Sequence, residues 1–304
     1  MKYFVKSLIK TIPVLFLITL IVFILVRVTG DPVSLMISET ATDEEREALR
    51  ESLGYNDPLY TQYFDYMGNL IKGDFGNSHR YETDALNLVI ERLPATIELA
   101  IASMIIAIIV SVPLGIMSAI KRNSFFDLFI TGGAVLGKAM PNFWLGIMMI
   151  LFLAVNLEMF PVSGRGSLLH LVLPAIALGT GIAAEMTRLI RSSMLEILEQ
   201  DFIRTARSKG LREAIVVNIH AFRNALIPVI TITALQTSTL IGGTLITETV
   251  FAWPGIGQLL IQAVNLRDMA VVQAAVFIIA IAVILSNLIA DSVYRLLDPR
   301  IKYD

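Results

Sequence analysis

A charged stretch interrupts the apolar second half of the chain, and it reads Arg188-Leu-Ile-Arg191-Ser-Ser-Met-Leu-Glu-Ile-Leu-Glu-Gln-Asp-Phe-Ile-Arg204-Thr-Ala-Arg-Ser-Lys-Gly210-Leu-Arg-Glu213. It continues through Arg223-Asn224-Ala-Leu-Ile-Pro228. Seven basic residues gather in this excursion: Arg188, Arg191, Arg204, Arg207, Lys209, Arg212 and Arg223. The neighbouring segments are apolar enough for lipid, so we expect a polar loop that emerges from a membrane to hold a soluble partner.

The composition is that of a membrane protein. Hydrophobic residues make up 55% of the chain and charged residues only 16%, whereas soluble domains have about 25% charged residues. The chain has no cysteine, which excludes disulfides, thiolate metal sites and thiol catalysis. Its three histidines, His79, His170 and His220, show no short metal-ligand spacing. We therefore expect no metal site and no cofactor.

Six apolar stretches are long enough to cross a bilayer as helices, which takes roughly 20 residues each. They cover about Ile9–Val28, Ala95–Ile120, Asp127–Leu157, Leu173–Ile190, Ala225–Val250 and Val271–Ile289. The third is interrupted by Lys138 and Pro141, so we expect a kink or a tilt there. The predicted fold class is all-α, integral membrane, with six transmembrane helices.

The orientation follows from the basic residues of the short loops. With six spans, the lysines before the first span, Lys121 and Arg122, the polar loop and the C-terminal basic residues all fall on one side, which is the cytoplasm. Both termini are then cytoplasmic and residues 31–93 extracytoplasmic. Within that segment, Thr42-Asp-Glu-Glu45 predicts a capping box that opens a short polar helix, and an amphipathic helix is expected to end at Gly73. This segment is either a lid on the spans or a surface for an extracytoplasmic partner.

Two helices are expected within the polar loop. Met194, Leu198, Phe202 and Ala206 repeat every four residues and predict one apolar stripe, with Gly210 placed to cap the helix. A second apolar face is predicted from Ile215, Ile219, Phe222 and Leu226. Such a loop can lie flat on anionic lipid. However, the acidic residues among its basic ones favour a protein partner: Glu196, Glu199, Asp201 and Glu213.

Several motifs, in order along the chain, resemble binding-protein-dependent ABC importer permeases, most closely those of the peptide and nickel branch. The polar loop carries Phe202-Ile-Arg-Thr-Ala-Arg-Ser-Lys-Gly210 and His220-Ala-Phe-Arg-Asn-Ala-Leu-Ile-Pro-Val229. The others are Gly30-Asp-Pro32, Asp57-Pro-Leu-Tyr60, Gly73-Asp-Phe-Gly76, Arg92-Leu-Pro-Ala-Thr96, Pro141-Asn-Phe-Trp-Leu-Gly146, Glu248-Thr-Val-Phe-Ala-Trp-Pro-Gly-Ile-Gly257 and Asp298-Pro-Arg-Ile-Lys302.

The resemblance implies a type I ABC importer transmembrane subunit in the bacterial inner membrane. Its expected partners are a second homologous permease, two ATP-binding subunits, an extracytoplasmic substrate-binding protein and the lipid bilayer, with no nucleic acid. The ATPases would grip the polar loop, residues 191–224, through Phe202, Arg204, Ala206, Lys209, Gly210, Arg212, Glu213, Arg223, Asn224 and Pro228. The general motif begins Glu-Ala-Ala, whereas this chain has Arg204, Thr205 and Ala206, so no contact that needs that glutamate is carried over.

Three segments are expected: residues 1–94 with the first span and the extracytoplasmic part, a core of residues 95–290, and a tail of residues 291–304. Charged or helix-breaking residues within the spans are candidates for the translocation path: Lys138, Pro141, Glu98 and Glu248. Glu98 and Glu248 fit the outer interface equally well. The stretch Gly132–Ala139 nearly spells a phosphate-binding loop but ends in alanine where a hydroxyl residue is needed. The chain is thus not expected to be an enzyme, and ATP hydrolysis falls to its partners.

The substrate interpretation favours short peptides, with nickel or a nickel complex as the alternative. A different class, a secondary transporter driven by an ion gradient, would need paired intramembrane carboxylates or an inverted repeat, and no convincing repeat is found. An intramembrane enzyme would need a Ser-His or paired-Asp arrangement at membrane depth, which the sequence does not offer.

Overall fold

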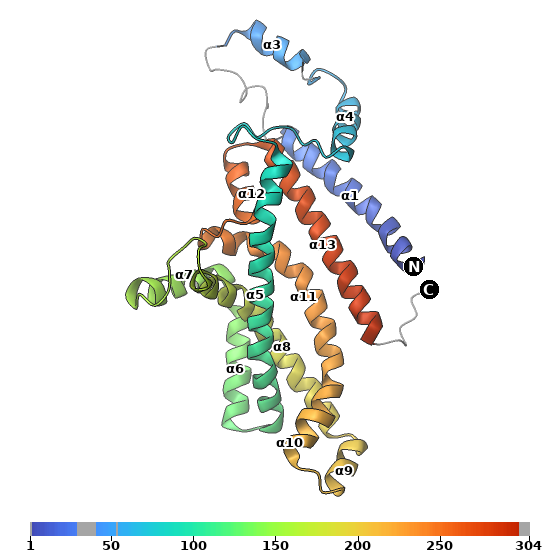
Figure 1. Cartoon of the computed structure of the whole chain (residues 1–304), viewed down its shortest axis with the longest axis vertical. Coiled ribbons are helices and arrows are strands. Elements are labelled where there is room, and N and C mark those ends of the chain that lie inside the picture. Colours follow the sequence, from blue (N-terminus) through green and yellow to red (C-terminus); the bar gives the residue numbers. More distant parts are fainter. Residues whose placement is uncertain (1, 29–40, 53, 298–304) are drawn as a thin grey trace. The chain divides into compact units, whose positions relative to one another are not determined.

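The computed structural model describes residues 2–28, 41–52 and 54–297, with helices and no strand within those ranges; the one β-type pairing there is an isolated bridge between Asn77 and Asp84. The helices are α1 (Lys2–Val28), α3 (Asp43–Ser52), α4 (Leu59–Ile71), α5 (Ala85–Ile120), α6 (Phe125–Ala139), α7 (Asn142–Met149), the π-helical η1 (Ile150–Asn156), α8 (Leu168–Leu198), α9 (Asp201–Ser208), α10 (Glu213–Ile215), the π-helical η2 (Val216–Ala221), α11 (Phe222–Val250), α12 (Ile256–Asn265) and α13 (Met269–Leu297) (Figure 1). The motif residues 30–32 and 298–302 lie outside the described residues.

The chain divides into two compact units. Unit 1 comprises Met1–Ala95 and Gly255–Ala282, and unit 2 comprises Thr96–Pro254 and Val283–Asp304. The three boundaries fall within α5, between α11 and α12, and within α13. The three-part division expected from the sequence therefore stays a prediction, because these units group residues by contact and not by membrane topology.

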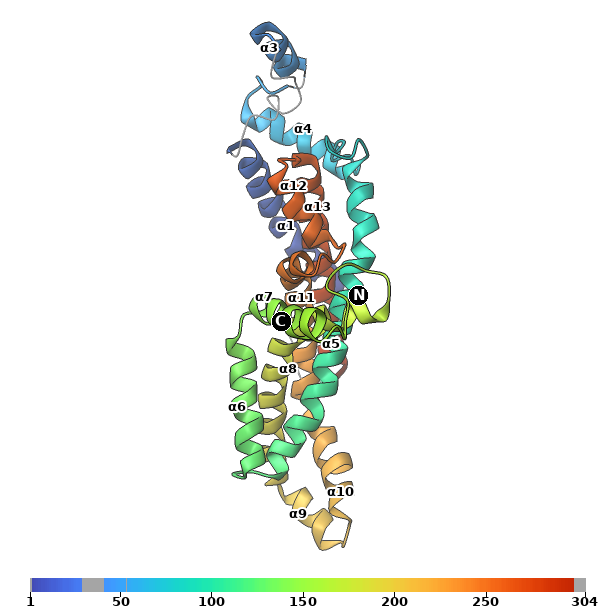
Figure 2. The same cartoon turned by 90° about the vertical axis from the view of Figure 1, so that its left-hand side faces the viewer.

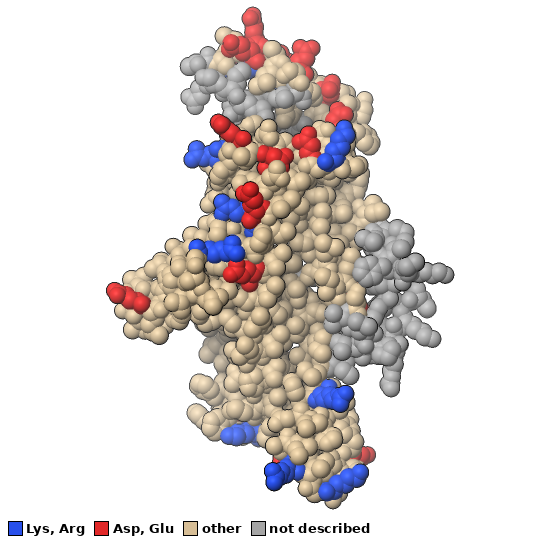
Figure 3. Space-filling view, in the orientation of Figure 1, with Lys and Arg blue, Asp and Glu red and all other residues tan. Residues whose placement is uncertain are grey.

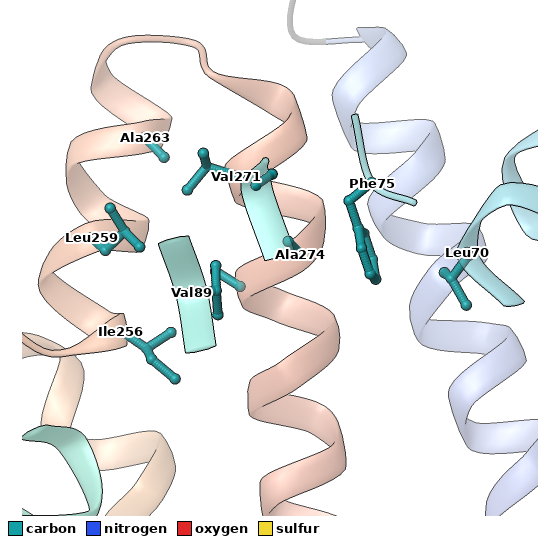
Figure 4. Packing of buried hydrophobic residues seen from close by; sticks show 10 residues of the cluster. Leu70, Phe75, Val89, Ile256, Leu259, Ala263, Val271 and Ala274 are labelled. Carbon is teal, nitrogen blue, oxygen red and sulfur yellow. The ribbon is translucent and has the colours of Figure 1, made fainter. Parts of the chain in front are cut away.

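Unit 1 has an apolar core in which α12 packs against the first part of α13. Ile256, Leu259 and Ala263 point from α12 toward Val271 and Ala274 of α13, with Val89 of α5 among them (Figure 4). Their spacing of three to four residues places each set on one helix face. Helix α12 was absent from the sequence prediction, because at ten residues it is too short to register as a span.

The two helices expected between the first two spans are confirmed. Glu45 accepts a hydrogen bond from the backbone of Thr42 at 2.9 Å, and the Thr42 hydroxyl accepts one from the backbone of Glu45 at 3.3 Å, which is the predicted capping box. Helix α4 ends just before Gly73, whose φ of +80° is a left-handed conformation that favours glycine. Tyr63 of α4 packs its ring against Phe16 and Phe23 of α1.

Unit 2 is built around α8, which contacts α6, α7 and α11 (Figures 1 and 2). Two glycines let helices approach α8 closely. A Cβ atom on Gly115 of α5 would come 2.7 Å from the Cβ atom of Ile190, and one on Gly179 of α8 would come 2.7 Å from the carbonyl oxygen of Ser103. Substitution of either glycine would force these helices apart.

The kink expected in the third span is confirmed, and it is sharper than a tilt. The segment Phe125–Ala139 meets the segment Asn142–Asn156 at 103°. Met140 adopts an extended conformation because the following Pro141 disfavours a helical one, and Pro141 then precedes the first turn of α7.

Helices α5 and α8, and residues Met269–Ser292 of α13, are each long and apolar enough to cross a membrane. The number rises to five if each of two bent pairs, around Pro141 and within residues 213–237, forms one span. Helix α1 contributes a shorter apolar stretch, Thr11–Val26. The fourth span runs on without a break from Leu168 to Leu198, so its helix extends into the charged stretch that the sequence assigned to a separate loop.

Candidate functional site

The polar loop, residues 191–224, begins with the last two turns of α8 and folds back through α9. Helix α9 buries Ile203 and Ala206, whereas the side chain of Phe202 is 40% exposed. The predicted stripe is therefore confirmed at Met194 and Ala206, which are buried, and wrong at Phe202. Helix α8 ends at Leu198, and a turn at residues 199 and 200 resets the helical phase, so that Ile203 takes the inner position.

Gly210 caps α9 as the sequence predicted. Its φ is +76°, its backbone N–H donates to the carbonyl of Arg207 at 2.9 Å, and the next N–H, of Leu211, donates to the carbonyl of Ala206 at 3.4 Å. A Cβ atom at Gly210 would meet nothing within 4 Å. The glycine is thus required by the backbone conformation and not by space.

An ion pair connects α9 to α10 across this glycine turn. The Arg207 guanidinium donates to both carboxylate oxygens of Glu213, at 2.7 and 3.1 Å. The hydrogen bonds from Arg207 lower the pKa of Glu213, and those same bonds raise the pKa of Arg207. Both side chains are about half exposed, so the pair orients the turn without adding much stability.

The second predicted apolar face of the loop is also wrong. Val216, Val217 and Ala221 are buried, whereas Ile219 is 55% exposed. The reason is local: residues 216–221 form the π-helical segment η2. Its i→i+5 hydrogen bonds put more residues into each turn than an α-helix has, which shifts the buried side away from the positions that an α-helical period predicts. Helix α9 packs on η2, and η2 contacts α8 and α11, so the loop is a packed projection.

The candidate partner-binding residues mostly lie on the surface of this projection. Ala206 is buried, the Pro228 side chain is outside the described residues, and the other candidates are exposed: Phe202, Arg204, Lys209, Gly210, Arg212, Glu213, Arg223 and Asn224. Lys and Arg side chains gather at the end of unit 2 that carries α9 and α10 (Figure 3). The arrangement suits a protein partner with a mixed-charge surface.

Two ion pairs join charged residues of the apolar helices in unit 2 to partners in the same unit. Lys138 of α6 donates to Glu185 of α8 at 2.6 Å, and Arg165 pairs with Glu98 of α5. These residues are partly exposed on the chain.

Glu248 differs from these because its side chain is wholly buried. It accepts a hydrogen bond from the hydroxyl of Thr96 at 2.7 Å. Burial of a carboxylate is stabilised only when donors surround it. The buried hydrogen bond favours a structural role for Glu248, and its two interpretations from the sequence, translocation path or outer interface, stay predictions.

A second ion pair between α6 and α8 was missed by sequence reasoning. Arg191 donates through Nε and Nη2 to the two carboxylate oxygens of Asp127, at 2.7 and 2.8 Å. The sequence marked Asp127 only as the start of a span and Arg191 only as a loop residue. Sixty-four residues separate the two, so no short spacing could reveal the pair.

Two of the motifs that carry the resemblance meet in space. Gly146 of the Pro141–Gly146 motif lies against Phe251 of the motif that begins at Glu248. Phe251 is buried in a cluster with Ala154, Leu173 and Ala177. The two motifs therefore form one contact between α7 and the end of α11.

Comparison with known proteins places these features in a family. Residues 111–303 match the family described as binding-protein-dependent transport system inner membrane component, and residues 1–100 match its N-terminal counterpart. The chain belongs to this family. It is a multi-pass inner-membrane permease subunit and is not itself the catalytic subunit.

Relatives match the permease over nearly its whole length. The oligopeptide transport system permease protein AppB of Bacillus subtilis (strain 168) is 42% identical over 99% of each chain. The dipeptide transport system permease protein DppB of Escherichia coli (strain K12) is 38% identical, over 100% of this chain and 99% of the relative. The glutathione transport system permease protein GsiC of the same strain is also 38% identical over the same shares.

Solved structures support the fold of the permease. An inward-facing structure of the MetNI methionine ABC transporter aligns with a TM-score of 0.56 and 20% identity, covering 69% of this chain and 96% of that chain. An amino acid ABC transporter aligns with a TM-score of 0.52 and 15% identity, covering 69% and 94%. The permease has the type I importer fold of these transporters.

Proposed function

We propose that this chain forms, with a second homologous permease, the translocation pathway of an ATP-driven importer of short peptides. The observation that carries the proposal is an identity of 38–42% over nearly the whole chain with relatives named as oligopeptide, dipeptide and glutathione permeases. Nickel or a nickel complex remains the alternative substrate. The described residues include no group of three or more His, Cys, Asp or Glu placed to hold a metal ion, which favours the peptide.

The proposed topology has six spans with both termini in the cytoplasm. The spans are α1, α5, the bent pair α6 with α7–η1, α8, α11 and α13. Two facts support this count: each helix covers one of the apolar stretches of the sequence, and the basic short loops then share one side. Residues 31–93 face the other side, where we expect the substrate-binding protein.

The polar loop is the proposed contact with two ATP-binding subunits. It is a packed projection whose exposed side chains carry both signs of charge, and Gly210 and the Arg207–Glu213 pair fix the angle between its helices. A rigid projection can transmit a displacement, whereas a flexible tether cannot. The candidate residues named from the sequence are therefore proposed as the gripping surface, with Ala206 as part of its packing.

Lys138 with its partner Glu185 is the proposed polar element of the translocation path. Charged side chains within a span are costly when they face lipid, and this pair is half exposed on the chain. We therefore place it against water or against the second permease, next to the bend at Pro141. Glu98, in the first half of α5, is paired with Arg165. Glu248 is buried and is assigned a structural role.

Reconstitution tests the proposal directly. The chain would be assembled in proteoliposomes with its permease partner, ATP-binding subunits and binding protein, and uptake of labelled di- and tripeptides and of nickel would be measured. We expect peptide uptake that requires both ATP and the binding protein. Uptake by the chain alone under an ion gradient would establish the secondary-transporter alternative. ATP-dependent uptake of nickel, with no uptake of peptide, would establish the nickel alternative.

A further inference from the structure

The carboxylate of Asp127 is the meeting point of three helices of unit 2. It accepts hydrogen bonds from the Ser118 hydroxyl of α5, from the Asn123 backbone N–H at 3.0 Å, and from the Thr131 hydroxyl of its own helix at 3.3 Å. Arg191 of α8 adds the two bonds described above. The Asp127 side chain is only 7% exposed and that of Arg191 27%. This carboxylate is therefore surrounded by donors and fixed in direction.

The geometry of the pair resists sliding between α6 and α8. A guanidinium that binds both oxygens of one carboxylate fixes both the distance and the relative orientation of the two groups, unlike a lysine contact. Next to it, Gly115 allows α5 to lie against Ile190 of α8. The cytoplasm-proximal ends of α5 and α6, as proposed above, are thus held to α8 by a directional contact and by close packing.

The pair lies close to the polar loop. Arg191 precedes the end of α8 at Leu198 by seven residues, which is about 10 Å along the helix axis. Beyond Leu198 the chain turns into α9, and α9 packs on η2, which also contacts α8. A displacement of α9 therefore has a continuous packed route to Arg191, and through Asp127 to α5 and α6.

We propose that Asp127 and Arg191 are positioning residues that make the ends of α5 and α6 move as one body with the polar loop when the ATP-binding subunits displace it. The inference rests on the proposed function, because it assumes that the loop is the contact with the ATPases. Without the pair, α8 slides on α6 and the displacement is lost before it reaches the rest of the spans.

The test uses the complete reconstituted importer and compares Asp127→Asn with Arg122→Gln. Arg122, in the turn between α5 and α6, pairs at 3.1 Å with Glu199, which directly follows α8. The two side chains are 55% and 72% exposed, so this pair should contribute little. For Asp127→Asn we expect uptake to fall about tenfold while ATP hydrolysis stimulated by the binding protein persists, a change within the usual range of coupling effects. Arg122→Gln should keep the wild-type ratio of ATP hydrolysed to peptide imported.

A distance measurement provides a readout that loss of fold alone would not give. The chain has no cysteine, so spin labels can be placed at Leu128 of α6 and Ser192 of α8, both exposed, without removing native thiols. In the otherwise wild-type complex the interlabel distance should be the same with and without nucleotide. In Asp127→Asn it should shift or broaden when nucleotide binds.

Each outcome decides between the alternatives. An unchanged ratio of hydrolysis to uptake in an assembled Asp127→Asn complex, or a parallel loss of both activities, overturns the positioning role. If that variant does not assemble, Arg191→Lys, which keeps the charge but loses the two-bond geometry, is measured in its place. Failure of both to assemble makes the pair a folding requirement and also overturns the proposal. An inactive wild-type complex would instead count against the proposed function itself.

Discussion

Gly146 of α7 lies so close to Phe251 that a Cβ atom on Gly146 would come 2.9 Å from the Cε2 atom of the ring. This contact joins the segment after the bend to the end of α11. The ring is buried, so it has little room to move.

We expect Gly146→Ala to destabilise the protein, because overpacking a filled contact typically costs about 1–3 kcal/mol. Thermal unfolding of the detergent-solubilised complex measures the effect. Gly132→Ala is the matched control: a Cβ atom there meets nothing within 4 Å, and alanine favours a helix by up to about 1 kcal/mol over glycine. A lower melting temperature in the control than in Gly146→Ala would contradict this account of the contact.

At Gly210 the backbone conformation decides the outcome. We expect function to fall in the order Gly, Asn, Ala, Val, because asparagine tolerates the left-handed region, whereas other residues lose roughly 1–2 kcal/mol and β-branched ones more. The space around the position is open, so size alone should not matter. The measurement is the ratio of ATP hydrolysed to peptide imported. Val should uncouple the two while membrane insertion stays normal; wild-type uptake by Gly210→Val would count against the role of the loop.

Lys138 and Glu185 allow a structural role to be separated from a role in the path. We expect Lys138→Met alone to lower both stability and uptake, because it leaves Glu185 without its 2.6 Å partner within a span. The double variant Lys138→Met with Glu185→Leu should regain stability, since no unpaired charge remains, but uptake should stay low if the pair contacts the substrate. Full recovery of uptake in the double variant would show that the pair is only structural.

The Arg207–Glu213 pair predicts how the turn of the polar loop responds to pH. The pKa of Glu213 is lowered in the folded loop. The contribution of the ion pair to the stability of the turn is therefore fully present above the ordinary pKa of glutamate, about 4.3, and is lost only as the pH falls through the lowered pKa of Glu213. Protease cleavage near Gly210 should therefore be constant at neutral pH and accelerate only in acid. Glu213→Gln should be cleaved faster at neutral pH and should lose most of the acid response.

The sequence predicted the helical class, the positions of the apolar helices, the kink at Pro141, the capping box at Thr42 and the cap at Gly210. Each of these rests on local chemistry: hydrophobic runs, the missing N–H of proline, and the freedom of glycine. What it missed depends on contacts or on a change of helical phase. The break after Leu198 and the π-helical turn at residues 216–221 moved Ile203 and Val217 inward in place of the predicted residues.

The candidate site was predicted in outline only. The exposed residues of the polar loop follow from its composition, but the partners of Lys138 and Glu98 could not be chosen from sequence, because several charges were available for each. The Asp127–Arg191 pair could not be found at all without the packing of α5, α6 and α8. Short signals determine a turn or a cap, whereas ion pairs between helices depend on how those helices lie.

The bend at Pro141 leaves α6 as a helix of fifteen residues, which rises about 22 Å, less than the hydrocarbon thickness of about 30 Å. In the six-span topology proposed above, α6 starts from the turn at residues 121–124 and ends within the bilayer, where the carbonyl groups of its final turn lack a following turn of the same helix. Acyl chains cannot solvate those oxygens. In that topology the end of α6, with the ammonium group of Lys138 in its last turn, needs water or protein around it, which lowers the cost of opening an aqueous channel beside it.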